Sequence, residues 1–241
     1  MDSNKKATGA QSHRIRVGLA GWSYDDWNGI VYPSPHPRDF HELTFLAQFF
    51  DAIEINTSFY QPLKPQLATH WIGLAAENPR FVFTAKMWQK FTHETGATFE
   101  DEKLVRAGFD PLFDAGKLGA VLLQFPFSFH HTPETLARLK QLLHTFRDYP
   151  LVVEVRHSSW AQPEFYELLH ERGVGFCNID QPVIGNNHYI GKAVVNALQL
   201  IHLLRKEKVK VPEPLRQHYP QLDSIASEPP KEPLLFPLAP T

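Results

Sequence analysis

The sequence alternates short, β-rich apolar runs with amphipathic helical stretches, and this alternation constrains the fold more than any other feature. Six strands are expected near residues 17–21, 52–56, 81–86, 118–125, 151–156 and 174–180. Helices are expected near residues 43–50, 66–78, 100–114, 132–146 and 163–172, with Thr132-Pro133 as a helix start and Gly116 and Gly173 as helix stops. Because no hairpin turn joins two strands, the order predicts a parallel α/β architecture.

Polar side chains recur on one face of these strands, near their carboxyl ends. Alternate residues of a strand share a face, so Val152, Glu154 and Arg156 oppose an apolar face. The same parity groups the polar residues Glu54, Asn56, Thr84, Lys86, Gln124, Asn178 and Asp180. By the same parity the Cys177 side chain points outward, toward the helices, where we expect it to be a small buried residue. A TIM-type barrel has one interior mouth and a helix-covered outside, and we favour it over a doubly wound sheet.

The sequence predicts too few strands and helices for the eight strand–helix units of a closed barrel. Sixty-one residues follow Asp180, but they contain one helical pattern, Gly191 to about Lys206, and then eight prolines between Pro212 and Pro240. Such a tail can neither form a central strand nor supply much core. We therefore expect a disordered lead (1–14), an incomplete barrel of about six parallel strands with a closing helix (15–210), and a proline-rich tail (211–241).

Charge and apolar patterning limit the compartment and the partners. The formal net charge is −2, from 24 basic and 26 acidic residues, so no global basic field favours nucleic acid. A single cysteine excludes an internal disulfide framework. The polar N-terminus is unlike a signal peptide, and no apolar run approaches the ~18 residues of a membrane span. The sequence predicts a cytoplasmic protein that does not enter membranes.

Several motifs together resemble the YecE-like family of unknown function, DUF72, whose fold is a TIM-type barrel. They are Gly21-Trp-Ser-Tyr24, Glu54-Ile-Asn-Thr-Ser-Phe-Tyr60, Phe83-Thr-Ala-Lys86, Gln124-Phe-Pro126, Glu154-Val-Arg-His-Ser-Ser-Trp160, Asn178-Ile-Asp180 and Asn186-Asn-His188. The resemblance covers roughly residues 15 to 225. In the family a long segment with the seventh strand precedes the Asn-Asn-His motif, whereas here Gln181–Gly185 leads into it directly. The resemblance therefore implies an internal deletion, which puts an intact ring of active-site residues in question.

Four residues at the strand exits carry the chemistry that we expect of a catalytic site: Glu54, Lys86, Glu154 and Asp180. Three carboxylates on one rim can hold a divalent metal or divide into general acid and base. The alternative is a rim in which Lys86 and Arg156 form ion pairs with them. A zinc site has little support, because paired histidines at ligand spacing are missing.

A further set of residues is expected to bind the ligand: Trp22, Tyr24, Asn56, Tyr60, Gln124, Arg156, Trp160 and His188. Arg156 suits a phosphate or carboxylate. The aromatic residues, with Trp27 and Trp88, fall in loops after strands and suit a ring-containing ligand, although such residues also form loop cores.

Together these features predict a hydrolase that acts on a phosphorylated or nucleic-acid-like ligand at the barrel mouth. The hydrolytic step rests on analogy with metal-dependent barrel endonucleases. The alternatives are a non-catalytic barrel that binds a sugar or nucleotide, and an inactive, deleted family member. Because six strands leave two edges unpaired, we also expect edge-to-edge self-association.

Overall fold

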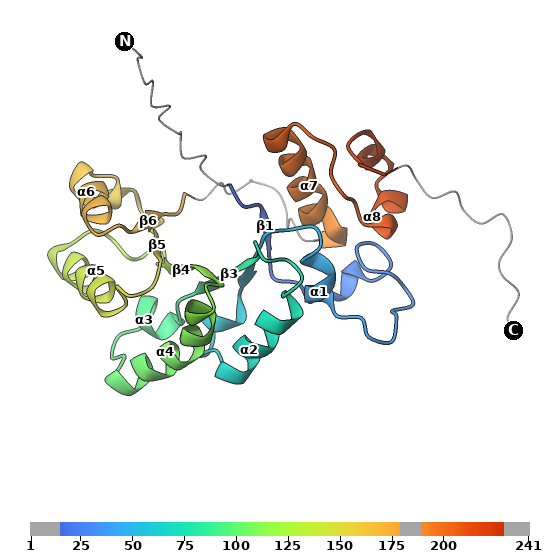
Figure 1. Cartoon of the computed structure of the whole chain (residues 1–241). Coiled ribbons are helices and arrows are strands. Elements are labelled where there is room, and N and C mark those ends of the chain that lie inside the picture. Colours follow the sequence, from blue (N-terminus) through green and yellow to red (C-terminus); the bar gives the residue numbers. More distant parts are fainter. Residues whose placement is uncertain (1–14, 179–188, 229–241) are drawn as a thin grey trace, which may run out of the picture.

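A computed structural model describes residues 15–178 and 189–228, and all structural statements refer to these residues. One parallel sheet runs through the chain in sequence order (Figure 1). Its strands are β1 (Gly18–Ala20), β2 (Ala52–Ile55), β3 (Val82–Lys86), β4 (Leu118–Gln124), β5 (Leu151–Glu154) and β6 (Gly175–Phe176). All six lie where the sequence predicts strands, and the parallel α/β architecture is confirmed.

The helices follow the strands in the expected alternation. They are α1 (Glu42–Leu46), α2 (Pro65–Leu74), α3 (Gln89–Thr92), α4 (Phe99–Asp114), α5 (Pro133–Thr145), α6 (Pro163–Glu171), α7 (Lys192–Arg205) and α8 (Glu213–His218). Five short 3-10 turns accompany them: η1 (Asp25–Trp27), η2 (Thr57–Phe59), η3 (Ser158–Trp160), η4 (Tyr189–Gly191) and η5 (Pro220–Ser224). Helices α2, α4, α5 and α6 lie along one side of the sheet, and α7 and α8 lie beyond β1 (Figure 1). No described helix has the length and apolarity that crossing a membrane requires.

The predicted parity of the strands holds for β2, β3 and β5. Their outward residues form the buried core against the helices, including Ile53, Ile55, Phe83, Ala85 and Val153, each at most 1% exposed. The register pairs Glu54 with Thr84 and Gln124 with Glu154. Polar residues of neighbouring strands therefore meet on the inner face, as the sequence predicts.

Strand β6 departs from the prediction. Its register pairs Val152 with Gly175 and Val153 with Phe176, so Cys177 continues on the side of Glu154. The Cys177 thiol lies 3.9 Å from Glu154 Oε2. The expectation that Cys177 faces the helices is wrong, because a shift of one residue in a strand exchanges its two faces.

The sheet is open, as expected of an incomplete barrel: β1 and β6 are its outer strands and do not pair with each other. Helix α7 packs beside β1 and buries Val194, Leu198 and Ile201. Leu204, three residues after the buried Ile201, is 44% exposed. Leu204 is the next-to-last residue of α7.

The segment after residue 210 contributes to the core, contrary to the expectation for a proline-rich tail. Leu215 in α8 and Leu222 in η5 are fully buried. The buried Arg216 donates from Nε to Asp223 Oδ1 at 2.9 Å and from Nη1 to the carbonyl oxygen of Glu228 at 2.9 Å. Prolines start these elements instead of interrupting them, because a missing N–H is tolerated in a first helical turn.

Two helical glycines give a matched test of the packing of α4 against Leu63, in the segment that precedes α2. A methyl group at Gly108 in α4 would lie 2.2 Å from the Leu63 carbonyl oxygen, whereas nothing lies within 4 Å of one at Gly73 in α2. We expect Gly108→Ala to destabilise the protein by about 1–3 kcal/mol, because backbone atoms must move apart. Gly73→Ala should stabilise it by about 0.5–1 kcal/mol through helix propensity. Urea unfolding of both variants measures this, and stabilisation by both would show that α4 is not held against Leu63.

Candidate functional site

The exits of β2 and β3 form the first part of the site. Lys86 Nζ lies 3.5 Å from Glu54 Oε1, and both side chains are about one-fifth exposed, at 21% and 23%. Buried Ser58 fixes this corner, because its hydroxyl accepts the Lys86 N–H at 3.0 Å and lies 2.8 Å from the carbonyl oxygen of Ile55. The Glu54 carboxylate therefore has a nearby cation, as the interpretation of an ion-paired rim requires.

The exits of β4 and β5 form the second part, centred on a buried carboxylate. Glu154 is 3% exposed. Its Oε1 accepts from Gln124 Nε2 at 2.7 Å and from Arg156 Nε at 3.1 Å. Its Oε2 contacts the weakly polar Cys177 thiol at 3.9 Å. One carboxylate oxygen is thus fully engaged, while the other keeps most of its hydrogen-bonding capacity.

Cys177 links the two parts of the site. Burial raises the pKa of its thiol, and the negative charges of Glu154 and Glu54 raise it further. Both carboxylates, one on β5 and one on β2, therefore act on the same thiol. Since a raised pKa keeps the thiol protonated at neutral pH, Cys177 is unsuited to be a nucleophile here.

His93 is a functional candidate that the predicted site residues do not include. It follows α3, and its Nδ1 lies 2.9 Å from Thr92 Oγ1. Desolvation lowers the pKa of its imidazole, and the positive charges of Arg156 and Arg138 lower it further. The imidazole is therefore neutral at neutral pH and lies close enough to Arg156 to feel its charge. The sequence signals were its position after the third strand and the pair Thr92-His93, which is one of the motifs that resemble the family.

The aromatic residues separate into core and rim. Trp160 is 1% exposed, stacks on Phe129 with ring centroids 5.2 Å apart, and donates from Nε1 to the Phe129 carbonyl oxygen at 2.7 Å. Its predicted role in ligand stacking is therefore wrong. Trp27 is likewise fully buried. Loop aromatics bury large apolar areas, and here that burial forms a core beneath the loops.

The other predicted aromatic residues remain nearer the surface. Trp22 is partly buried and meets Trp71 edge-on with centroids 4.9 Å apart. Tyr24 donates to the Ala20 carbonyl oxygen, and burial raises the pKa of its hydroxyl, with Glu54 adding to the effect. Tyr60 is 69% exposed, and its carbonyl oxygen accepts from Trp88 Nε1 at 3.2 Å.

Three predicted residues add less to the geometry. Asn56 precedes η2, and its amide would lie 3.5 Å from a methyl group at Gly21, which adopts a φ of +84°. Asp180 and His188 fall outside the described residues. Within residues 15–178 and 189–228, no three histidine, cysteine or acidic side chains gather as metal ligands. A divalent metal therefore stays a prediction that depends on Asp180.

Comparisons with known proteins agree on the family. Residues 16–221 match the family described as "Protein of unknown function DUF72". The UPF0759 protein YunF of Bacillus subtilis is 30% identical over 181 residues, which cover 71% of this chain and 62% of YunF. A DUF72 family protein of Enterococcus faecalis has a similar crystal structure, with a TM-score of 0.57, 25% identity, and coverage of 71% of this chain and 65% of that one.

A second solved structure supports the fold. A DUF72 family protein of Thermotoga maritima superposes with a TM-score of 0.64 and 24% identity, over 80% of this chain and all of that chain. By contrast, the match spans less than two thirds of YunF and of the Enterococcus faecalis protein.

Proposed function

This chain belongs to the DUF72 family of proteins of unknown function, and we propose from the chain's own residues that the rim binds a small phosphorylated ligand and hydrolyses the phosphate ester. Arg156 and Lys86 bind the phosphoryl oxygens, and Glu154 is the general base. Gln124, Asn56, Tyr24 and Tyr60 complete the surroundings of the ligand.

The orientation of Arg156 supports binding of an anion. Its Nε is held by the buried Glu154, while Nη1 and Nη2 make no hydrogen bond or ion pair with a described residue. The side chain is 38% exposed, so these two nitrogens are accessible to a ligand. A planar guanidinium with one edge held by a carboxylate is well oriented for phosphate oxygens.

Glu154 Oε2 and neutral His93 support a hydrolytic step. In that step Glu154 takes a proton from water, whose oxygen bonds to phosphorus as the bond to the leaving oxygen breaks. The leaving oxygen takes a proton from solvent. Arg156 and Lys86 stabilise the charge that develops on the phosphoryl group. His93, close to Arg156, is a second group able to accept a proton.

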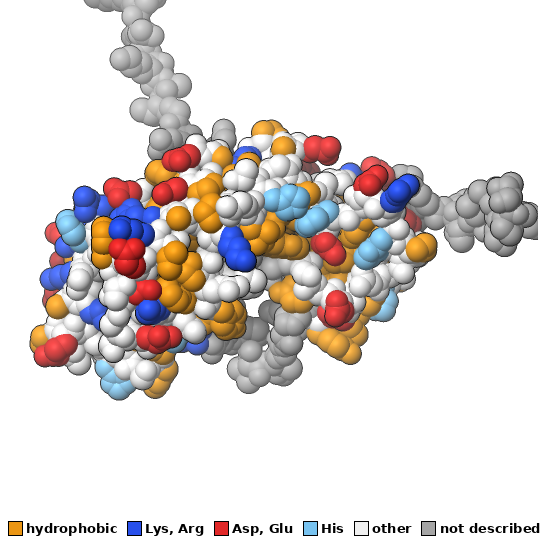
Figure 2. All heavy atoms as spheres, turned by 90° about the horizontal axis from the view of Figure 1, so that it is seen from below, with side chains coloured by type: hydrophobic (Ala, Val, Ile, Leu, Met, Phe, Trp, Pro, Cys, Tyr) orange, Lys and Arg blue, Asp and Glu red, His pale blue; other side chains and the backbone are white. Residues whose placement is uncertain are grey.

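The charges on the surface favour a small ligand over a long nucleic acid. Basic and acidic side chains are interspersed on the face in Figure 2, which presents no continuous basic surface there. Long polyanions bind mainly through many phosphate contacts. The two rim cations suit one or two phosphate groups instead.

Binding of inorganic phosphate tests the assignment of Arg156. We expect Arg156→Leu to weaken it about tenfold, equivalent to about 1.4 kcal/mol, because two accessible donors and a charge are lost. Arg147→Leu is the matched control: Arg147 follows α5, where its Nη1 donates to the His144 carbonyl oxygen at 3.0 Å. Calorimetric titration measures both variants, with thermal melting to confirm that they fold. Equal losses would show binding by diffuse surface charge.

A barrel that binds its ligand without turnover is the second candidate, because ion pairs already occupy both carboxylates of the rim. A panel of phosphate monoesters and diesters, assayed with and without divalent metal ions, separates the two functions. Saturable binding with no turnover under any condition supports the binding protein. Absence of both would fit an inactive member that has lost an internal segment.

A further inference from the structure

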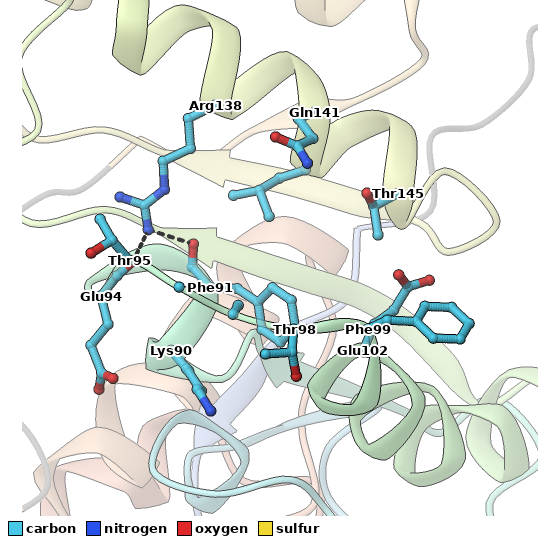
Figure 3. A pocket seen from close by; sticks show the side chains of 13 residues that line it. Lys90, Phe91, Glu94, Thr95, Thr98, Phe99, Glu102, Arg138, Gln141 and Thr145 are labelled. Atoms are coloured by element: carbon cyan, nitrogen blue, oxygen red, sulfur yellow. Dashed lines mark hydrogen bonds between the residues drawn. The ribbon is translucent and has the colours of Figure 1, made fainter.

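A cavity lies in the helical layer, between α4, α5 and the loop that joins α3 to α4. Its volume is about 360 Å³. Figure 3 shows Arg138, Gln141 and Thr145 on α5 facing Thr98 and Phe99 across it. Pockets that hold small organic ligands begin at about this size, near 300 Å³. None of the rim residues that carry the proposed function lines this cavity.

Arg138 is the unusual residue of the cavity. Its Nη2 donates to the Phe91 carbonyl oxygen at 2.8 Å and to the Glu94 carbonyl oxygen (Figure 3). Among the described residues, no carboxylate forms an ion pair with it, and its Nε and Nη1 have no hydrogen-bond partner. Burial lowers the pKa of its guanidinium, which still stays charged at neutral pH. A half-buried cation here therefore lacks a counter-ion.

The other charges around the cavity are mostly compensated. Lys90 Nζ lies 2.8 Å from Asp101 Oδ1, and Glu102 Oε1 accepts from Arg106 Nε at 2.7 Å. The Glu94 carboxylate extends away from Arg138 in Figure 3. Glu100, in the first turn of α4, likewise has a partner, since its Oε1 lies 2.8 Å from Lys103 Nζ. The charges therefore favour a single negative charge placed beside Arg138.

The rest of the lining indicates what the anion is attached to. Phe91, Phe99 and Leu142 give the cavity an apolar part, and Thr95 and Gln141 add polar groups near Arg138. We propose that this cavity binds a small organic monocarboxylate, with its carboxylate against Arg138 and its apolar body against these phenylalanine and leucine side chains. The pairing supplies the counter-ion that Arg138 lacks and removes apolar ligand surface from water.

Benzoate and its neutral isostere benzamide test the proposal with the full chain. We expect benzoate to bind at least about tenfold more tightly than benzamide in calorimetric titration, a difference of about 1.4 kcal/mol or more. Arg138→Met should remove that preference. Since Arg138 also anchors two carbonyl oxygens, Gln141→Glu is the second variant. It places a carboxylate one turn along α5 from Arg138, and should abolish benzoate binding without loss of thermal stability.

Binding of benzoate in this cavity should be independent of the rim residues that carry the proposed function. Arg156→Leu should leave benzoate binding unchanged, and benzoate should not compete with inorganic phosphate. Equal affinities for benzoate and benzamide, or undiminished benzoate binding by folded Gln141→Glu, would overturn the assignment. Failure to bind benzoate at millimolar concentration would overturn it as well.

Discussion

Turnover of a phosphate ester is expected to fall about 10²- to 10⁴-fold when Glu154 is replaced by glutamine, because a positioned general base contributes about that factor. The substitution keeps the shape of the side chain, and its amide oxygen can still accept from Gln124 and Arg156. What it removes is the capacity of Oε2 to take a proton. Binding of inorganic phosphate should change much less than turnover.

The control for this experiment is Glu164→Gln, an exposed carboxylate at the start of α6. Steady-state assays give kcat and KM for both variants, and near-identical melting curves would show that Glu154→Gln retains the fold. Undiminished turnover by Glu154→Gln would make Glu154 a structural partner of Arg156. If the protein shows no turnover and Glu154→Gln leaves phosphate binding unchanged, the non-catalytic barrel is favoured.

The cluster of Gln124, Glu154 and Arg156 was predictable because the period of a strand is two residues. Once Glu154 is assigned to the inner face, Arg156 follows, and parallel pairing brings Gln124 beside them. The same reasoning failed for Cys177. Only Gly175 and Phe176 form strand β6, and so short a segment does not fix its own parity. The register with β5 decides which way Cys177 points, and a single sequence does not show that register.

The burial of residues in the loops and in the segment after residue 210 was harder to predict than the positions of the strands. The loops after strands contain many aromatic residues, and nothing in their order distinguishes buried Trp160 from exposed Tyr60. The decisive contact is with Phe129, 31 residues earlier in the chain. Similarly, proline content suggested a tail after residue 210, whereas the apolar residues Leu215 and Leu222 anchor that segment to the core.

The purified chain is expected to self-associate or aggregate and to have low thermal stability, because its sheet has two free edges. No described strand pairs with the outer side of β1 or of β6. Helix α7 covers apolar surface beside β1, but a helix cannot satisfy the N–H and C=O groups of a strand edge. Unpaired edges are templates for pairing with another chain.

Exposed apolar side chains accompany these edges. Phe176 in β6 is 42% exposed, although it contacts Phe165 and Tyr166 of α6. On the outer side of α7, Leu200 and Leu203 are 46% and 69% exposed. Apolar side chains beside an unpaired edge favour contact between two chains, whereas a charged residue there opposes it.

Phe176→Lys therefore tests whether the β6 edge drives association. We expect it to shift the chain toward monomer in size-exclusion chromatography over a range of concentrations, because lysine on an edge strand opposes pairing. Leu104→Lys is the control, since Leu104 is 54% exposed on α4 and distant in sequence from both edge strands. If the unmodified chain is a monomer with a sharp, reversible thermal transition well above about 65 °C, the upper limit for ordinary mesophile domains, the open sheet is self-sufficient and the prediction is wrong. Monomer formation by Leu104→Lys as readily as by Phe176→Lys would instead attribute association to general surface apolarity, because the two variants add the same charge, one on an edge strand and the other on a helix.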